Sequence, residues 1–378
     1  MILTENKPLA PFTTFGIGGP ARWFVEALSE QEIVAAAVWA DEHGAPLFVL
    51  GGGSNLLVSD AGFDGLVLKI GLRGITAPLH PDASGQVVYQ AAAGEDWDQF
   101  VERTVLDRCA GIECLAGIPG TVGGTPVQNV GAYGQEVASA IERVRAFDRK
   151  ERTFVEFLAA ECCFTYRHSR FNSTDRERYI VTHVDYRLTP GGMPTVRYGD
   201  LHRALAESKP QNAELSLSEI AAIVRRIRQS KGMLVVEGDP DCQSAGSFFK
   251  NPAVSKEQLQ HIAANSGKEP PIYPIENRGL LASHPLLEVE TSLKSEEIAL
   301  FKVPAAWLIE QAGFSKGYAL GRAGVSSRHT LALVNLGDRN GQTGASAAEI
   351  LALAHQIVAT VEKRFGVRLE MEPVMVGF

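Results

Sequence analysis

Hydrophobic and polar positions in the first third of the chain follow helical and strand spacing in turn. Residues 30–43 form an amphipathic pattern that predicts a helix, and Gly44 is placed to end it. The short apolar run 46–50 predicts a strand that leads into a glycine turn. A strand over 86–94 and a helix with Asp96 as its N-cap are then expected. The pattern favours an α+β or α/β fold for this part of the chain.

Residues 111–134 interrupt this regular pattern. They include seven glycines and two prolines, which excludes one continuous helix or strand. Irregular segments of this length are uncommon in compact domains and are usually functional. We therefore expect a compact loop region with a functional role.

Regular spacing returns in the second half of the chain. A capped helix is predicted from Ser216 or Ser218 to Lys231, and Gly232 ends it, so we place a domain boundary near that glycine. Two further helices and a last strand are expected over 303–313, 347–366 and 367–377.

Length, charge and composition limit the class of protein. At 378 residues and 45% apolar content, the chain is long enough for two domains or more. It has no apolar run of about 18 residues and no signal-peptide pattern, so we expect no membrane span and a cytoplasmic location. The net charge of -8 argues against nucleic acid as a partner, and an anionic small molecule would need a local basic pocket.

The cysteines argue against a disulfide framework and a structural zinc site. They form an odd set without a C-x-x-C pair, so we expect reduced thiols and no metal. The five positions are Cys109, Cys114, Cys162, Cys163 and Cys242.

Two glycine motifs differ in what they can bind. The turn Gly51–Asn55 offers unhindered backbone N–H groups and two polar side chains, an arrangement that suits a phosphate or pyrophosphate, although a tight turn after a strand is the plain alternative. The segment Gly16–Ala21 fits G-x-G-x-x-A, but no apolar strand leads into it and Pro20 lacks an N–H, so we reject a dinucleotide-binding Rossmann fold. A Walker-type loop is absent from the sequence.

The later glycine-rich segments and one serine suggest further chemistry. Residues 118–124 and 128–134 combine backbone freedom with hydroxyl and amide groups, which suits a flat heteroaromatic ligand with several polar edges. Ser247 follows Gly246 and precedes two phenylalanines. Its hydroxyl is either a buried structural group or a proton carrier.

Seven short motifs occur along nearly the whole chain: FGIGGPA, GGGSNLLVSD, GIPGTVGGTPVQNVGAYG, YRHSRF, SAGSFFKNP, PAAWLIEQAGFSKG and LEMEP. Together and in this order they resemble the UDP-N-acetylenolpyruvoylglucosamine reductase family, FAD-dependent enzymes of bacterial peptidoglycan precursor synthesis.

The resemblance implies an α+β fold with a vanillyl-alcohol-oxidase (PCMH) type FAD-binding domain of two subdomains, followed by a smaller α+β substrate-binding domain. The FAD-binding domain would span 1–231, with its subdomains divided near 72–85, and the substrate-binding domain 232–355. Residues 356–378 would form the end of the last helix and a strand that returns a glutamate to the active site.

The implied reaction reduces UDP-N-acetylglucosamine enolpyruvate to UDP-N-acetylmuramate, with non-covalent FAD, NADPH as hydride donor and a monomeric enzyme. Hydride reaches the terminal vinyl carbon of an enol ether, and the neighbouring carbon is then protonated. Negative charge must meanwhile flow onto the adjacent carboxylate, so a fixed cation is required.

Catalytic roles follow from the same resemblance. Arg167 matches the arginine of the family's Tyr-Arg pair, and its guanidinium suits a carboxylate. Ser247 matches the proton donor. Glu372 matches the catalytic carboxylate, and we leave open whether it is a hydrogen-bond donor or orients Arg167. Glu370 lies two residues away and is indistinguishable from Glu372 by strand periodicity.

The resemblance also assigns contacts with the flavin and the substrate. The flavin set is Gly51, Gly52, Gly53, Ser54, Asn55, Ile118, Pro119, Gly120, Thr121, Gly123, Gly124, Gly131, Tyr133, Gly134 and Tyr166. The substrate set is Tyr198, Arg228, Lys231 and Asn251. Pairing with the helix C-terminal dipole is the plain alternative for Arg228 and Lys231. His329 is left unassigned.

Two other functions stay open at this point. Another flavin oxidoreductase of the same fold would not need the SAGSFFKNP and LEMEP motifs. A non-catalytic flavin or nucleotide-sugar binding protein would not need Ser247, Arg167 and Glu372 together. Pro373 departs from the β-branched residue usual in the family and predicts an edge strand or a bulge.

Overall fold

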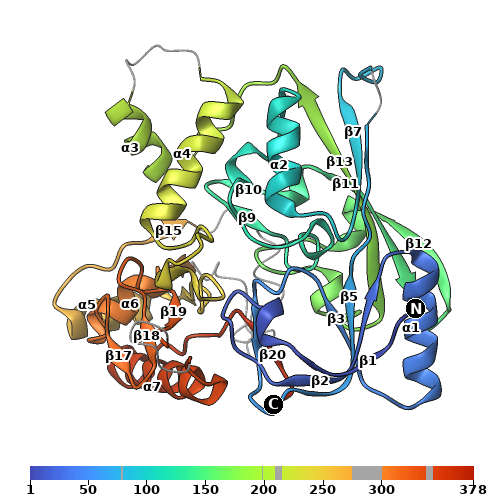
Figure 1. The fold of residues 1–378 in the computed structure, drawn as a ribbon. Coiled ribbons are helices and arrows are strands. Elements are labelled where there is room, and N and C mark those ends of the chain that lie inside the picture. Colours follow the sequence, from blue (N-terminus) through green and yellow to red (C-terminus); the bar gives the residue numbers. More distant parts are fainter. Residues whose placement is uncertain (78–79, 198, 209–214, 275–299, 338–343) are drawn as a thin grey trace, which may run out of the picture. The chain divides into compact units, whose positions relative to one another are not determined.

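The computed structural model describes residues 1–77, 80–197, 199–208, 215–274, 300–337 and 344–378 (Figure 1). Contacts divide the chain into two compact units. Unit 1 contains Met1–Pro8, Pro20–Gly53 and Gly62–Val235, and unit 2 contains Leu9–Gly19, Ser54–Ala61 and Val236–Phe378. Unit 2 therefore combines the C-terminal part of the chain with two short N-terminal segments.

The first sheet of unit 1 is built from β1 (Thr4–Pro8), β2 (Pro20–Ala27), β3 (Leu47–Leu50) and β5 (Phe63–Ile70). Their order is β1-β2-β5-β3, with β2 and β3 parallel to β5 and β1 antiparallel to β2. Helix α1 (Glu30–Glu42) connects β2 to β3. The predicted helix and the strand after it are confirmed, and the Ser29 side chain caps the helix by accepting from the N–H of Glu32.

The second sheet of unit 1 has six strands, with the path β12-β11-β13-β7-β6 and β8 paired to β13. The strands are β6 (Ile75–Thr76), β7 (Val87–Ala92), β8 (Cys109–Ala110), β11 (Ile141–Asp148), β12 (Thr153–Leu158) and β13 (Tyr179–Pro190). Helix α2 (Trp97–Leu106) begins at the predicted cap, Asp96. It packs on β13 (Figure 1), where the ring of Phe100 from the helix lies 5.0 Å from the ring of Tyr186 from the strand.

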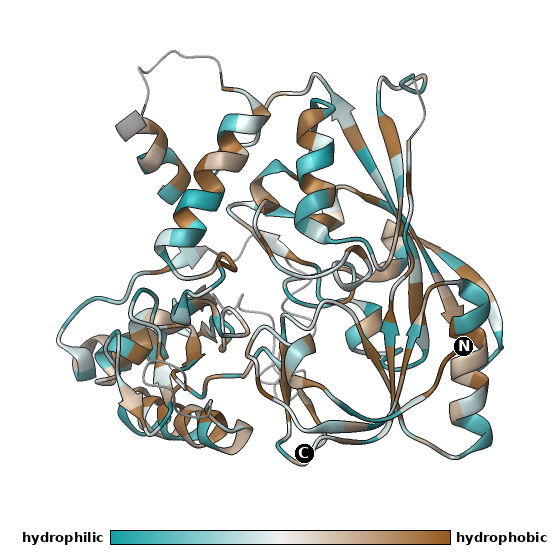
Figure 2. Ribbon diagram, viewed as in Figure 1, coloured by the Kyte–Doolittle hydropathy of each residue, from teal (hydrophilic) through white to brown (hydrophobic). Residues whose placement is uncertain are grey.

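Two more helices and an irregular region complete unit 1. The helices are α3 (Gly199–Ser208) and α4 (Leu217–Ser230), and Figure 2 shows hydrophilic and hydrophobic bands on both α2 and α4. Ser216 and Glu219 form the capping box of α4, which settles the start that the sequence left between two serines. The predicted irregular region 111–134 is confirmed, since it contains only single 3-10 turns and strands of two residues.

Unit 2 is a smaller α+β unit. Its helices are α5 (Lys256–Ser266), α6 (Ala305–Gln311) and α7 (Ala347–Phe365). Its short strands are β4 (Leu56–Val58), β14 (Ala253–Val254), β15 (Tyr273–Pro274), β16 (Phe301–Lys302), β17 (Ala319–Leu320), β18 (Ala323–Val325), β19 (Leu333–Asn335) and β20 (Val374–Val376). Fully buried Phe15, Phe248 and Phe365 belong to one apolar core. Both predicted helices of this half are confirmed.

The prediction of a strand over all of 367–377 is wrong. Only Val374–Val376 forms a strand, β20, which pairs in parallel with β4. The strand begins immediately after Pro373, which has no N–H to donate to a ladder. Before that proline, the backbone makes a single isolated bridge from Met371 to Phe249.

Within the described ranges, none of the helices combines the length and apolarity needed to cross a bilayer. The same residues contain no cluster of His, Cys, Asp and Glu side chains that could hold a metal ion. All five cysteines are free thiols.

Candidate active site

The first glycine motif follows β3 and lies against the second glycine-rich region within unit 1. A Cβ atom added to Gly52 would lie 2.5 Å from the Cα of Gly120, and one added to Gly51 would lie 2.9 Å from Oγ1 of Thr121. Only glycine therefore fits at Gly52 without a shift of the backbone opposite. The fold brings together two segments that the sequence assigned to the same ligand.

Polar groups in this cradle match the needs of a bound flavin nucleotide. The N–H groups of Gly51, Gly52 and Gly53 make no hydrogen bond to the described residues. The hydroxyl oxygen of Thr121 is buried and likewise lacks a partner in the described part of the chain. Buried polar groups normally find a partner. Donors of this kind, beside glycines that admit close approach, fit the diphosphate and ribityl oxygens of FAD.

Substitution of Gly52 by alanine should weaken FAD binding while the protein stays folded. The new methyl group would overlap the backbone of Gly120, and overpacking of this kind costs about 1–3 kcal/mol, or roughly tenfold or more in the dissociation constant. Titration of the apoprotein with FAD, followed by flavin fluorescence, measures the effect. Gly199→Ala is the matched control, because an added Cβ there meets nothing within 4 Å. Equal affinity of the Gly52 and Gly199 variants for FAD would contradict this assignment.

The end of the first motif, Ser54 and Asn55, belongs to unit 2 and is hydrogen-bonded to the backbone around the predicted catalytic Glu372. The amide nitrogen of Asn55 lies 3.4 Å from the carbonyl oxygen of Glu372, and the N–H of Val374 donates to the carbonyl of Asn55 at 2.9 Å. The hydroxyl of Thr14 lies 2.5 Å from the carbonyl oxygen of Ser244 and 3.4 Å from that of Ser54, so it bridges the two segments. The segments around Asn55, Glu372 and Ser244 are thus held together inside unit 2.

Ser247 lies on a segment anchored in the core of unit 2. Gly246 has φ +71°, a left-handed conformation that suits glycine, and Ser247 itself is half-buried. The N–H of Phe248 donates to the carbonyl of Leu331 at 2.8 Å, and the carbonyl of Phe248 accepts from the N–H of Glu372 at 2.9 Å. Phe248 and Phe249 are buried in the core, so their rings fix the backbone of the serine.

The same contacts place Glu372 beside the Ser247 segment, and side-chain exposure distinguishes it from Glu370. The side chain of Glu370 is 70% exposed and pairs with Nζ of Lys250 at 2.5 Å. Glu372 is half-buried, and its N–H bonds to the residue after Ser247. Within unit 2, the fold therefore brings together two of the three predicted catalytic residues.

Arg167, the third predicted catalytic residue, occupies a tight turn in unit 1. Thr165 and His168 close the turn with reciprocal backbone hydrogen bonds of 3.0 and 3.1 Å. Arg167 has φ +56°, a left-handed conformation that disfavours a side chain by roughly 1–2 kcal/mol. Its Nη2 donates to the carbonyl of Gly131 at 3.0 Å, and its guanidinium lies 5.4 Å from the ring of Tyr166.

Gly131 belongs to a small hairpin formed by β9 (Gly131–Ala132) and β10 (Gln135–Glu136). The two residues of its turn, Tyr133 and Gly134, have φ +50° and +83°, as a type I′ turn requires. Arg167 thus reaches the backbone of a segment predicted to hold the flavin ring. The sequence predicted both segments but not their contact.

The predicted substrate residues are placed in different environments. Arg228 is buried, and its Nε and Nη2 donate to the carbonyls of Gly117 and Met233 at 2.9 and 2.6 Å. Burial lowers the pKa of Arg228, and Tyr133 acts in the opposite direction. Lys231 pairs with Asp200 at 2.6 Å. The side chain of Arg228 therefore joins α4 to neighbouring loops. Pairing with the helix C-terminal dipole, the plain alternative given by the sequence, did not predict this structural role.

The other two predicted substrate residues are Asn251 and Tyr198. The side chain of Asn251 accepts from the N–H of Ala305 at 2.9 Å and so caps α6. Tyr198 lies outside the described residues. Nothing in the structure tests whether Arg228, Lys231, Asn251 or Tyr198 contacts a substrate, so these four assignments stay predictions.

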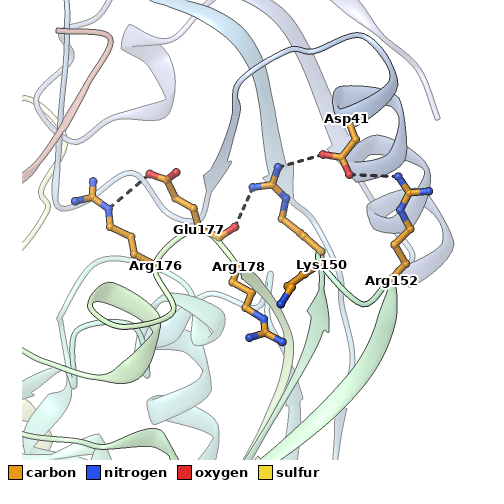
Figure 3. Close-up of a pocket in the computed structure, with 7 residues that line it drawn as sticks. Asp41, Lys150, Arg152, Arg176, Glu177 and Arg178 are labelled. Atoms are coloured by element: carbon orange, nitrogen blue, oxygen red, sulfur yellow. Dashed lines mark hydrogen bonds and ion pairs between the residues drawn. The ribbon is translucent and has the colours of Figure 1, made fainter.

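A hollow of about 540 Å³ on unit 1 contains none of the predicted site residues (Figure 3). It is lined by Asp41, Arg149, Lys150, Arg152, Arg176, Glu177 and Arg178. Figure 3 shows some of its charged side chains paired with each other, as in Arg152 with Asp41 at 3.7 Å and Arg176 with Glu177 at 3.6 Å. Exposed ion pairs of this kind contribute little to the stability of the fold. We interpret the hollow as a solvated charged surface.

Comparison with known proteins gives consistent similarities. Residues 239–376 match the family model for the C-terminal domain of UDP-N-acetylenolpyruvoylglucosamine reductase, and residues 21–154 match an FAD binding domain. UDP-N-acetylenolpyruvoylglucosamine reductases of Streptomyces coelicolor and Thermobifida fusca are each 42% identical over 99% of this chain, covering 90% and 98% of those proteins. The crystal structure of the Thermus caldophilus reductase aligns with a TM-score of 0.60 at 26% identity, covering 99% of this chain and 98% of that one.

Proposed function

The chain belongs to the UDP-N-acetylenolpyruvoylglucosamine reductase family and is an FAD-dependent oxidoreductase, and from this premise we propose how its residues carry out the reaction. Its fold is α+β, with an FAD-binding domain of the vanillyl-alcohol-oxidase type. The enzyme reduces UDP-N-acetylenolpyruvoylglucosamine in peptidoglycan precursor synthesis. We further propose NADPH as the reductant, a cytoplasmic location and a monomeric state.

The flavin is assigned to two parts of unit 1. One is the glycine cradle, where Gly51–Gly53 face residues 118–124, and the other is the β9–β10 hairpin, called the Tyr133 hairpin below. Gly51–Asn55 would hold its diphosphate, and residues 118–124 with the hairpin would hold the ring and ribityl chain. When bound, FAD takes hydride from NADPH and supplies it to the enol ether. The single observation that carries this assignment is the cradle itself, where Gly52 faces Gly120 and the buried hydroxyl of Thr121 has no hydrogen bond within the described ranges.

Arg167 is the proposed clamp for the substrate carboxylate. A guanidinium can bind both carboxylate oxygens, and it stabilises the charge that accumulates there as the vinyl carbon is reduced. The turn that carries it supports this role, because Arg167 keeps a left-handed backbone at a cost in free energy. Strained residues of this kind cluster at functional sites.

Ser247 is the proposed proton donor to the carbon next to the carboxylate. The rigid backbone on either side of Phe248 supports the role, since a general acid must be held in a defined position. The backbone N–H of Glu372 donates to this segment, at the carbonyl of Phe248. We keep both roles proposed for its carboxyl group, which are donation of a hydrogen bond and orientation of Arg167.

We also propose that unit 1 supplies most of the flavin site and that unit 2 supplies the substrate-binding domain. The sequence-based division puts the FAD-binding domain at 1–231 and the substrate-binding domain at 232–355, with 356–378 returning Glu372. The two compact units differ from this division, because segments 9–19 and 54–61 belong to unit 2 and unit 1 extends to Val235.

The half-reactions test this function directly. The purified protein should show a flavin spectrum, lose its colour anaerobically with NADPH, and regain it when UDP-N-acetylenolpyruvoylglucosamine is added. A flavin that NADPH bleaches but this substrate does not reoxidise would point to another electron acceptor. A colourless protein that takes up no FAD would refute the proposal.

Substitution of Glu372 by glutamine should slow reoxidation by the substrate more than about tenfold, because the amide cannot share a proton or carry the charge that orients a guanidinium. Glu370→Gln is the matched control, since Glu370 is an exposed surface residue. Stopped-flow measurement of both half-reactions compares the two variants. Equal rates would remove Glu372 from the site.

A further inference from the structure

Asn129 connects two segments of unit 1 that the proposed function needs, the turn that carries Arg167 and the Tyr133 hairpin. It is 1% exposed and has φ +44°, a left-handed conformation that asparagine tolerates better than most residues. It lies just before the Tyr133 hairpin in sequence. Asn129 belongs to neither the flavin set nor the substrate set assigned above, so its complete burial needs a separate explanation.

The amide of Asn129 is fully engaged. Its Nδ2 donates to Oε2 of Glu136 at 2.8 Å and to the carbonyl of Thr165 at 3.0 Å. Its Oδ1 accepts from the N–H of Ala138 at 3.2 Å. Two acceptors face the nitrogen and one donor faces the oxygen, so the surroundings permit only one orientation of the amide.

These bonds join the end of the hairpin to the turn that carries Arg167. Glu136 is the last residue of β10, and Thr165 closes the turn with His168. The other side of the turn is held by Asn172, whose Nδ2 donates to the carbonyl of Arg167 at 3.1 Å. The left-handed backbone of Arg167 is thus fixed from both sides, and its guanidinium bonds to Gly131 of the same hairpin.

We propose that Asn129 is a positioning residue that holds the Arg167 turn in register with the Tyr133 hairpin. The inference rests on the proposed function, in which this hairpin cradles the flavin and Arg167 binds the substrate carboxylate. Loss of the amide would leave the carbonyl of Thr165 with the N–H of His168 as its one donor among the described residues, and would let the turn relax toward an unstrained backbone. The guanidinium would then move relative to the hairpin, and misplacement of a reacting group by about 1 Å can cost about a hundredfold in rate.

Two variants separate the side chain from the backbone. Asn129→Gly keeps access to the left-handed conformation and removes all three side-chain hydrogen bonds. Asn129→Asp keeps the shape but puts a carboxylate against the acceptors Glu136 and Thr165. Glu136→Gln is the control, because its amide oxygen still accepts from Asn129.

Amide hydrogen exchange of the full-length protein provides a readout that does not depend on turnover. The N–H of His168 bonds to the carbonyl of Thr165, so its exchange should accelerate by roughly fivefold or more in both Asn129 variants. Exchange in β11 and β13 should stay unchanged, and Glu136→Gln should match the wild type. Unchanged exchange at His168 would overturn the coupling. Faster exchange throughout unit 1 would also overturn it, since Asn129 would then support the fold as a whole.

The half-reactions complete the test. Reduction by NADPH should stay within a few fold of the wild type, whereas reoxidation by the substrate should slow by about tenfold to a hundredfold in both variants. Equal slowing of both steps would contradict a role in positioning Arg167. Failure of the proposed function is separately visible, because the wild-type flavin would then not be reoxidised by UDP-N-acetylenolpyruvoylglucosamine, while exchange at His168 would still report the local coupling.

Discussion

Replacement of Ser247 by alanine should leave bleaching of the bound FAD by NADPH nearly unchanged and slow reoxidation by the substrate about a hundredfold to ten-thousandfold, the range that general acids supply. Only the second step needs a proton at carbon, so only that step should suffer. The backbone of the variant should be intact, because the Phe248 hydrogen bonds that fix this segment are made by backbone groups. Stopped-flow absorbance of the flavin measures each step on its own.

Ser247→Cys provides a graded comparison for this prediction. A thiol retains a proton to donate, so this variant should recover part of the rate that alanine loses. Loss of both half-reactions in Ser247→Ala would instead indicate misfolding. A normal rate of reoxidation would show that another group donates the proton.

Helices were the part of the fold most open to prediction. Their starts carry side chains that satisfy free backbone N–H groups, as Ser29, Asp96 and Ser216 do here. These signals are local, so they can be recognised without knowledge of the tertiary structure.

Most strands of the largest sheet were not predicted, although it forms much of the core of unit 1; the exception is β7, which confirms the strand expected over 86–94. Its strands β11 and β13 carry several charged residues, and their register contains two irregularities. Strand β12 likewise pairs with β11 through residues that are mostly not buried. Such strands are specified by their partners more than by their own hydrophobic pattern. The final strand was overestimated for a related reason, since Pro373 limits it to the three residues after the proline.

The site could be predicted as a set of residues but not as an arrangement. Glu370 and Glu372 are equivalent by periodicity, and both contact the segment that follows Ser247. What separates them is that the side chain of Glu370 is exposed and paired with Lys250, whereas Glu372 is half-buried. Arg228 looked like a surface cation at the end of a helix, yet it is buried against the carbonyl of Gly117. Asn129 lies in the predicted segment 128–134, but its own role was not predicted. An asparagine inside a glycine-rich loop is a usable signal, because asparagine is enriched at left-handed positions.

Substitution of Arg167 by lysine should preserve FAD binding and slow reoxidation by the substrate by roughly a hundredfold or more. Lysine keeps the positive charge, but a point charge cannot replace the planar fork that binds both carboxylate oxygens. The contact of Nη2 with the carbonyl of Gly131 should also be weakened, so the charge loses its position as well as its shape. Flavin titration and the two half-reactions separate these effects.

Arg170→Lys is the matched control for this prediction, because it lies in the same loop and serves the fold. Its guanidinium stacks 4.1 Å from the ring of Phe157 and pairs with Asp175 at 2.7 Å. That variant should unfold at a lower temperature and turn over normally. Arg167→Lys should unfold at the wild-type temperature and turn over slowly, since its strained turn contributes little to stability. Normal turnover by Arg167→Lys would remove the arginine from the active site. Equal loss of turnover in both variants would show that the loop supports activity only through its folding.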